Sequence, residues 1–399
     1  MAPATDHRDT PPRVVYLDHA ATTPMVPAAL DAMTAHLREV GNASSLHGSG
    51  RRARRVVEES RETIASVLGS RPGEVVFTSG GTEADNLALK GIAWSRRQAD
   101  RARVRILASA VEHHAVLDPL HWLGEEAGFE VALIDVDDLG RIRLDHLREL
   151  VEADPASVAV VSVMWANNEV GTVQPVAEVV ELCSAYGIPV HSDAVQAVGA
   201  VPVDFAGVGV DALTLTGHKV GGPFGVGALV ARRDLAITAL VHGGGQERDI
   251  RSGTIDVPAI AAFAAAVELA VKQQGEYADR VGALRDRLVA GVRDVVPDAV
   301  LNGDPVHRLP GNAHFSFPGC EGDALLMLLD AQGIECSTGS ACSAGVPQPS
   351  HVLIAMGRSD ALARSSLRFS LGHTSTQADV DALVRALGPC VERARMAMR

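Results

Sequence analysis

The sequence predicts an α/β protein with a mainly parallel seven-stranded sheet flanked by helices and a smaller α+β C-terminal domain. The first observation is that short β-rich runs alternate with helical patterns from about residue 14 to residue 257, and each run ends in small or polar residues. The second is that these runs are almost continuously apolar, which is typical of strands covered by helices on both faces.

Seven runs have the strand pattern. They are 74–80, 104–110, 130–136, 158–165, 188–193, 212–217 and 226–231. In sheets of this kind ligands bind beyond the carboxyl ends of the strands. We therefore expect the chemistry of the protein in the residues that follow each run.

The pattern changes after residue 257 to long helical segments, followed by a short strand-like run at 312–317 and a Ser/Gly-rich stretch at 337–350. We predict an N-terminal tail over 1–13, a large domain over 14–257 and a small C-terminal domain over 258–399. The stretch 337–350 is predicted to be a flexible loop of the small domain.

Composition excludes several classes of protein. Of 399 residues, 47% are hydrophobic and 21% charged, so the chain can bury a core and is not disordered. A net charge of −13 argues against direct nucleic-acid binding, although one basic patch remains, formed by Arg51, Arg52, Arg54 and Arg55. No run approaches the length of a membrane span.

The cysteine content and the N-terminal residues indicate the cellular compartment of the protein. Five cysteines without CxxC spacing support neither a disulfide framework nor a zinc finger, and indicate a reducing compartment. Asp6 and Asp9 argue against a secretory signal and a transit peptide. We expect a cytoplasmic protein with no membrane association.

The first candidate site is the segment GGTEADN, 80–86, between a predicted strand and a predicted helix. Gly80 and Gly81 let the main chain approach a ligand, and free N–H groups at a helix N-terminus attract phosphate. By itself such a segment is more often a turn with a helix cap. The interpretation of this segment as a phosphate site therefore needs support from a second site.

That second site is formed by Asp193 and Lys219, each at the end of a predicted strand. Pyridoxal phosphate (PLP) enzymes use a lysine as a Schiff base and a carboxylate beside the pyridinium nitrogen. Lys219 lies in an uncharged stretch, where loss of solvent lowers the pKa of an amine. Either residue alone is better explained as a surface lysine or a strand-end cap, but the pair with the phosphate segment favours PLP.

The chain also resembles a known family in a series of motifs spread over nearly its whole length. These are YLDHAATTP (16–24), GNASSLH (41–47), TSGGTEADNLA (78–88), EHHAV (112–116), NNEVG (167–171), SDAVQAVG (192–199), TGHKVGGPFGVGAL (216–229), HGGGQERDIRSGT (242–254), STGSACSAG (337–345) and SLRFSLG (366–372). They resemble, in order, the motifs of NifS/IscS-type cysteine desulfurases. The resemblance implies a fold-type I PLP enzyme of the class V aminotransferase group that takes sulfur from L-cysteine and releases L-alanine.

The resemblance also implies a role for each matching residue. Lys219 carries PLP as a Schiff base, and His113 stacks on the ring and transfers protons. The further cofactor-binding residues are Gly81, Thr82, Asp193, Gln196, Thr216, His218 and, from the second copy of a homodimer, Thr254. The substrate carboxylate is received by Asn168 and Arg368. Taken alone, His113 and Arg368 are better explained as a core histidine and a surface ion pair.

Cys342 distinguishes desulfurases from aminotransferases, because only desulfurisation needs a thiolate to take the sulfur as a persulfide. The other four cysteines, Cys183, Cys320, Cys336 and Cys390, are expected to be packing residues. No permanent metal is expected, although the resemblance implies that Cys342 can transiently ligate a nascent iron–sulfur cluster.

Three questions stay open at this level. The sulfur acceptor is either an iron–sulfur scaffold, a tRNA-thiolation enzyme or a cofactor-sulfuration pathway. Selenocysteine lyase, ordinary aminotransferase and partner-dependent sulfur-relay subunit are alternative functions. Two positions depart from the family pattern. Thr216 replaces the usual serine and keeps its hydroxyl. His19 replaces an aromatic residue, and the sequence indicates no function for it.

Overall fold

The computed structural model describes residues 14–339 and 348–397. At its centre is a seven-stranded sheet with the order β2-β8-β7-β6-β5-β3-β4. Its strands are β2 (Val75–Thr78), β3 (Arg105–Ser109), β4 (Glu130–Ile134), β5 (Val158–Ser162), β6 (Val190–Asp193), β7 (Ala212–Thr216) and β8 (Gly227–Ala231). Each lies inside one of the seven predicted runs, so the predicted α/β class is confirmed.

The sheet is parallel except at β8, which runs antiparallel to both β2 and β7. The connection from β7 to β8 comprises residues 217–226 and contains only the short helix η3 (Gly217–Lys219). A parallel crossover needs about a dozen or more residues and usually an α-helix, so this short connection returns the chain antiparallel. It also places Lys219 directly at a strand end.

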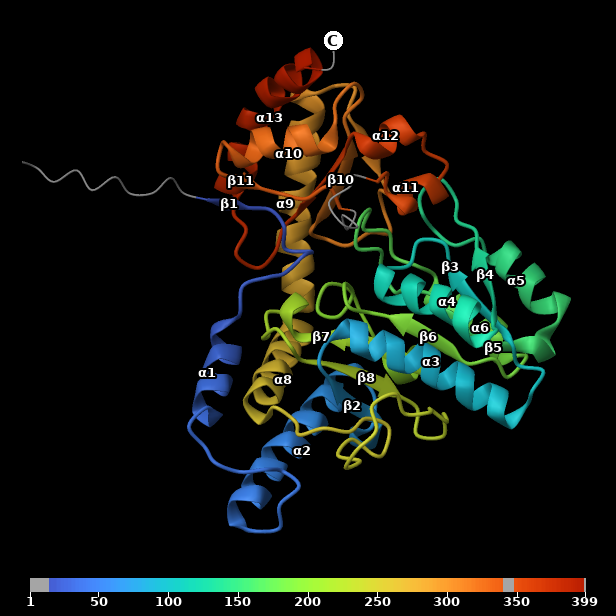
Figure 1. Ribbon diagram of the computed structural model, residues 1–399. Helices are drawn as coiled ribbons and strands as arrows, with labels where there is room; N and C mark the ends of the chain where they lie inside the picture. Colours follow the sequence, from blue (N-terminus) through green and yellow to red (C-terminus); the bar gives the residue numbers. More distant parts are fainter. Residues whose placement is uncertain (1–13, 340–347, 398–399) are drawn as a thin grey trace, which may run out of the picture.

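Helices cover both faces of the sheet (Figure 1). The helices from the first two thirds of the chain are α1 (Pro27–His36), α2 (Gly48–Leu68), α3 (Gly81–Ala99), α4 (His114–Ala127), α5 (Leu144–Ala153), α6 (Val176–Ser184), α7 (Phe205–Val208) and α8 (Val257–Lys272). Alternate strand residues enter separate hydrophobic clusters: Val75 and Phe77 belong to one, and Val76 belongs to another. This alternation follows from the two-residue repeat of a strand.

Edge strand β4 differs from the expectation that all strands are covered on both faces. Val131 and Leu133 are 36% and 46% exposed. Among the described strands it pairs with β3 alone, so one of its edges has no neighbour there. Its apolar residues are therefore a weaker guide to burial than those of the central strands.

A second region surrounds a three-stranded antiparallel sheet with the order β12-β10-β9. Its elements are α9 (Gln274–Val295), β9 (Val300–Asn302), β10 (Asn312–Ser316), α10 (Gly322–Asp330), β11 (Ile334–Glu335), α11 (His351–Ala355), α12 (Asp360–Arg364), β12 (Ser366–Ser370) and α13 (Gln377–Ala397). In Figure 1 the long helix α9 extends from α8 into this region.

Hydrophobic clusters join segments that lie far apart in the sequence. Strand β1 (Val15–Tyr16) pairs in parallel with β11, and Val15 belongs to the cluster of the second region. Phe263 of α8 packs into the cluster that lies against the large sheet. The division of the chain into domains at 257/258 stays a prediction.

Within the described ranges, every helix is too short or too polar to cross a membrane.

Candidate active site

A cavity lies at the carboxyl ends of the sheet strands, between the sheet and the segment of β12 that carries Arg368. Most of the residues predicted from the sequence line it: Gly81, Thr82, His113, Asn168, Asp193, Gln196, Thr216, His218, Lys219 and Arg368. The fold thus gathers in one place side chains that are scattered along the chain.

Lys219 lies at the end of η3 and is largely withdrawn from solvent. Its Nζ donates hydrogen bonds to the carbonyl oxygens of Ala20 at 2.5 Å and Ala21 at 2.8 Å. Burial, assisted by the positive charge of Arg368, lowers the pKa of Lys219 to about 8. This is the direction expected from the uncharged sequence around it, and it makes the amine available as a nucleophile near neutral pH.

Asp193 ends β6 and faces the same cavity. Its Oδ1 accepts a hydrogen bond from the main-chain N–H of Val195 at 2.8 Å. Burial, followed by the charge of Asp85, raises the pKa of Asp193 to about 8. Gln196, three residues after Asp193, donates through Nε2 to the carbonyl oxygen of Ala20 at 2.9 Å.

The N-terminus of α3 supplies a place for a phosphate. Gly80 has φ 152° and ψ −177°, a main-chain conformation that is essentially restricted to glycine. A Cβ at Gly81 would approach Val195 Cγ2 to 3.0 Å, which shows how closely the main chain borders the cavity. Across the cavity, Nδ1 of His218 is buried and has no hydrogen-bond partner among the described residues. A buried ring nitrogen without a partner and a helix N-terminus fit the phosphate of PLP.

His113 is the N-cap of α4, and its ring orientation is fixed by a main-chain hydrogen bond. Nδ1 accepts from the N–H of Ala115 at 3.0 Å, so the proton of the neutral ring lies on Nε2. Burial, followed by the charge of Lys219, lowers the pKa of His113 to about 4. The exposed ring of His114 binds Asp118 instead, with 3.0 Å between Nδ1 and Oδ1. Both histidines nevertheless border the cavity.

Arg368 is held by partners that the sequence did not indicate. One guanidinium nitrogen donates to Oδ1 of Asp18 at 2.8 Å, and the other donates to the main-chain oxygen of Asn168 at 2.8 Å. Nε of Arg368 is buried and has no partner within the described part of the chain. Arg368 is thus oriented by Asp18 and Asn168 while it keeps donor capacity for a carboxylate.

Two of the predicted residues need separate mention, because only one of them is described and that one does not line the cavity. Cys342 lies outside the described residues. Thr254 is exposed, and nearby Arg251 binds Glu83 of the same chain, with 2.8 Å between Nε and Oε1.

Three of the remaining cysteines are buried, as expected of packing residues, and Cys336 is half-buried. Burial raises the pKa of both Cys183 and Cys336 to about 12, so neither thiol is an effective nucleophile at neutral pH.

Asp85 is a cavity residue that the sequence reasoning missed. It lies four residues after Gly81 on α3, which is one helical turn. That spacing was the available signal, because it places both residues on the same face of the helix. Asp18 had no comparable signal, since it meets Arg368 only through the pairing of distant segments.

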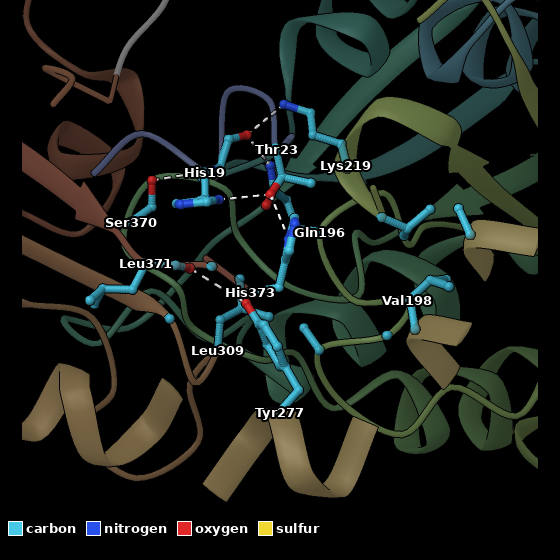
Figure 2. A pocket seen from close by; sticks show the side chains of 18 of the residues that line it. His19, Thr23, Gln196, Val198, Lys219, Tyr277, Leu309, Ser370, Leu371 and His373 are labelled. Carbon is cyan, nitrogen blue, oxygen red and sulfur yellow. Dashed lines mark hydrogen bonds between the residues drawn. The ribbon is translucent and has the colours of Figure 1, made fainter. Parts of the chain in front are cut away.

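A second cavity lies beside the first, and the two share Ala20, Val195, Gln196 and Lys219 in their walls. Figure 2 shows His19, Thr23 and His373 close together in this second cavity. Thr23 Oγ1 is 2.7 Å from Nδ1 of His19 and 3.2 Å from Nδ1 of His373. The unusual residue His19 therefore takes part in a hydrogen-bond network next to the lysine.

The fit of the lysine, the carboxylate and the phosphate site to PLP defines a class of PLP-dependent enzymes, and comparison with known proteins identifies the family. The model of the family "Aminotransferase class-V" matches residues 15–383. The chain belongs to this family and, within it, to the group of IscS- and NifS-like cysteine desulfurases, which are PLP-dependent enzymes of fold type I.

Three similar proteins support this assignment. An IscS-like cysteine desulfurase of Mycobacterium tuberculosis is 59% identical, over 96% of this chain and 98% of its own length. The cysteine desulfurase IscS of Dictyoglomus turgidum is 42% identical, over 96% of each chain. Among solved structures, a NifS-like protein is 36% identical with a TM-score of 0.88, over 96% of this chain and all of its own.

Proposed function

We propose that this enzyme removes sulfur from L-cysteine, releases L-alanine and holds the sulfur as a persulfide on Cys342. The proposal rests on one observation: residues that precede and follow Cys342 in the sequence line the cavity that fits PLP. Ser337, Gly339 and His351 all line the cavity, and Cys342 lies between them in the sequence. Described residues on both sides of this cysteine in the sequence therefore line the cavity.

The cavity residues have distinct roles toward the cofactor. Lys219 holds it covalently through Nζ, Asp193 faces the ring nitrogen and Gln196 faces the ring hydroxyl. The phosphate is held by residues that offer N–H groups or hydroxyls, namely Gly81, Thr82, Thr216, His218 and, from a second copy of the chain, Thr254. When bound, PLP withdraws electrons from the substrate Cα.

The residues of the chain then bind the substrate and move its protons. Arg368 and Asn168 bind the substrate carboxylate, and Lys219, with its lowered pKa, takes the Cα proton. The Cys342 thiolate attacks the substrate sulfur, so that an S–S bond forms and the C–S bond breaks. His113 stacks on the ring and moves the protons of the thiol and of the leaving group. The balance is L-cysteine plus the Cys342 thiol giving L-alanine plus the Cys342 persulfide.

Matched cysteine variants test this proposal. Cys342→Ser should keep the PLP absorption but form no persulfide, because a hydroxyl is far less nucleophilic at neutral pH than a partly ionised thiol. Cys336→Ser should keep the activity, since the thiol of Cys336 is half-buried and poorly ionised. Alanine release and mass-spectrometric mapping of the persulfide are measured in both. Normal sulfide release by Cys342→Ser, or a persulfide on Cys336, contradicts the proposal.

The products formed separate this function from related ones. Keto-acid formation in place of alanine indicates an aminotransferase, and a strong preference for selenocysteine indicates a selenocysteine lyase. Dependence of turnover on an added protein indicates a sulfur-relay subunit. Rapid release of alanine and sulfide by the purified protein with cysteine and a reductant supports the desulfurase.

The persulfide needs an acceptor. We place the enzyme in the cytoplasm, as a homodimer that passes sulfur to a protein such as an iron–sulfur scaffold or a tRNA-thiolation enzyme. Transfer of labelled sulfur from loaded enzyme to each purified acceptor identifies the recipient, and cell fractionation tests the location.

A further inference from the structure

The segment 18–23 holds two of the side chains that border the cavity. The carbonyl oxygen of Ala20 accepts hydrogen bonds from Nζ of Lys219 at 2.5 Å and from Nε2 of Gln196 at 2.9 Å. The carbonyl oxygen of Ala21 accepts a second hydrogen bond from Nζ of Lys219 at 2.8 Å. Nζ is therefore bound to two adjacent main-chain oxygens, which we call the carbonyl pair.

Main-chain hydrogen bonds fix this segment on two sides. Oγ of Ser370, in β12, accepts from the N–H of Ala20 at 2.9 Å. The carbonyl oxygen of Ser370 accepts from the N–H of His19 at 3.1 Å. At the other end of the segment, the N–H of Thr23 donates to the carbonyl oxygen of His218, in η3, at 3.1 Å. The carbonyl pair thus lies between β12 and the short helix that ends in the lysine.

The side chain of Thr23 adds a link inside the segment. Its Oγ1 lies 2.7 Å from Nδ1 of His19 and 3.2 Å from Nδ1 of His373 (Figure 2). A hydroxyl can donate to one imidazole while it accepts from the other. A Cβ added at Gly372 would overlap the His19 ring, and Oγ1 of Thr374 lies 3.4 Å from its Nε2. Thr23 is therefore bound to a ring that has no room to move toward β12.

We propose that Thr23 is a positioning residue that fixes the carbonyl pair as the acceptor of Lys219 Nζ whenever this nitrogen is not bonded to PLP. Nζ is free in the cofactor-free protein, and again after the substrate amino group has displaced it from the cofactor. Only hydrogen bonds form and break in this exchange. The carbonyl pair keeps the amine at the cavity wall, where the proposed function needs it as a base. The inference rests on that proposed role of Lys219.

The carbonyl pair should favour the charged form of the lysine. Hydrogen bonds from an ammonium to a carbonyl oxygen are stronger than those from a neutral amine. Burial lowers the pKa of Lys219 to about 8, and these two hydrogen bonds oppose a further decrease. A variant that displaces the carbonyl pair should therefore have a still lower pKa at Lys219.

The charges that act on Lys219 are kept in every variant below. They are those of Arg368, Asp18 and Asp193. The neighbouring imidazoles are mostly neutral at pH 7 and above, because burial lowers the pKa of His19, His113 and His218 to about 4 and that of His373 below its usual value. A change in the titration of Lys219 then reports its hydrogen bonds.

A pair of Thr23 variants tests the inference without relying on activity. Thr23→Val removes the hydroxyl with little change of shape, and Thr23→Ser keeps it. Acetylation of Lys219 in the cofactor-free protein, mapped by mass spectrometry between about pH 6 and 10, gives the midpoint of its titration. The midpoint should fall by about half to one unit in Thr23→Val and stay native in Thr23→Ser.

The rate of PLP capture gives a second signature with an opposite sign to general damage. At pH 7 a lower pKa leaves more of the Lys219 amine neutral, so capture should be about three- to fivefold faster in Thr23→Val. A site that is merely distorted would capture PLP more slowly. Thr34→Val is the matched control, because that hydroxyl is exposed on α1 and donates to the carbonyl oxygen of Asp31 at 3.1 Å. It should keep the native midpoint and rate.

Ser370→Ala perturbs the carbonyl pair from the other side, because it removes the acceptor of the Ala20 N–H. It should lower the midpoint in the same direction, and it replaces Thr23→Val as the test if that variant does not fold.

The outcomes separate this inference from the proposed function. If Lys219→Ala retains lysine-bound PLP, the proposed role of Lys219 fails. If Lys219 carries PLP but Thr23→Val has the native midpoint, or Ser370→Ala does where it is the test, the positioning role is refuted. Slower PLP capture by Thr23→Val, an equal shift in Thr34→Val, or a shifted midpoint in Thr23→Ser also refutes it, because the effect then does not come from the Thr23 hydroxyl.

Discussion

Burial in the cavity changes the pKa values of single residues from those of the same residues in water. Lys219 has its pKa lowered to about 8, so its amine is mostly neutral above that pH, whereas an exposed lysine stays charged to about pH 10.4. His113 has its pKa lowered to about 4, so its ring is neutral from pH 5 upward. Loss of solvent is the largest cause in both, because it disfavours the charged form.

We predict that PLP capture by the cofactor-free protein becomes faster as pH rises through about 8, because the neutral amine of Lys219 is the nucleophile. Lys219→Ala should show no absorption of lysine-bound PLP after dialysis. Lys272→Ala is the control, since that lysine lies on the surface and pairs with Glu268. Retention of the absorption by Lys219→Ala, or a capture rate that is constant between pH 7 and 9, contradicts the prediction.

At the scale of elements, the start of α3 depends on a main-chain conformation that side chains disfavour. Gly80→Ala should therefore destabilise the protein by about 1–3 kcal/mol and weaken PLP binding, because the first turn of α3 has to shift. Gly282→Ala, inside α9, is the control: nothing lies within 4 Å of the added Cβ, and alanine favours helix. Urea unfolding and PLP titration measure both variants. Equal PLP affinity in the two variants would show that the main-chain conformation of Gly80 is unimportant for PLP binding.

The Gly-rich segment 242–254 is attached to the large sheet by a buried ion pair. Both oxygens of Glu247 accept from Arg61 of α2 at 2.8 Å, and one also accepts from the N–H of Phe77 in β2 at 2.9 Å. Each Glu247 oxygen therefore has a donor, although the side chain is completely buried. The segment that precedes Thr254 is thereby anchored to two elements.

Arg61→Met should cost about 3–5 kcal/mol of unfolding free energy, because it leaves the charge of Glu247 buried without its partner. Arg148→Met breaks an exposed pair with Glu152 and should cost at most about 1 kcal/mol. Chemical denaturation at pH 7 compares the two. Similar losses in both variants would mean that the buried pair does not anchor the segment.

At the scale of the whole molecule, we predict a homodimer with shared active sites. Thr254 is exposed and is not one of the residues that line the cavity of its own chain, although the resemblance assigns it to a PLP phosphate. Arg251 binds Glu83 at the start of α3 of the same chain, so a change there would disturb that chain's own site. Thr254 alone is therefore the better probe of sharing.

Mixing Lys219→Ala with Thr254→Ala under conditions of subunit exchange should restore activity. Each mixed dimer then has one site with both changes and one site with neither, so activity should exceed that of either parent. Mass spectrometry of tagged subunits confirms the exchange, and mixing either parent with itself is the control. A monomer in sedimentation, or no recovery after proven exchange, contradicts the model.

The positions of the seven sheet strands, and of Gly81, Asp193 and Lys219 in the cavity, could be predicted from local patterns. The resemblance, rather than a local pattern, indicated His113, Asn168, Gln196 and Arg368. A buried strand must be apolar, and a ligand-binding turn at its end must contain small or polar residues, so Thr216, Lys219 and Asp193 stand out in the chain. The resemblance then supplied the chemistry of the site.

Only the tertiary structure decided which distant side chains meet and how their charges interact. Asp18 reaches Arg368 because the chain after β1 bridges to Ser370 of β12, and Asp85 acts on Asp193 because α3 packs over the ends of the strands. The antiparallel direction of β8 was not predicted, although the eight residues between the runs 212–217 and 226–231 are too few for a parallel crossover. Burial sets the pKa values of these groups, and burial is a property of the assembled fold rather than of any local segment.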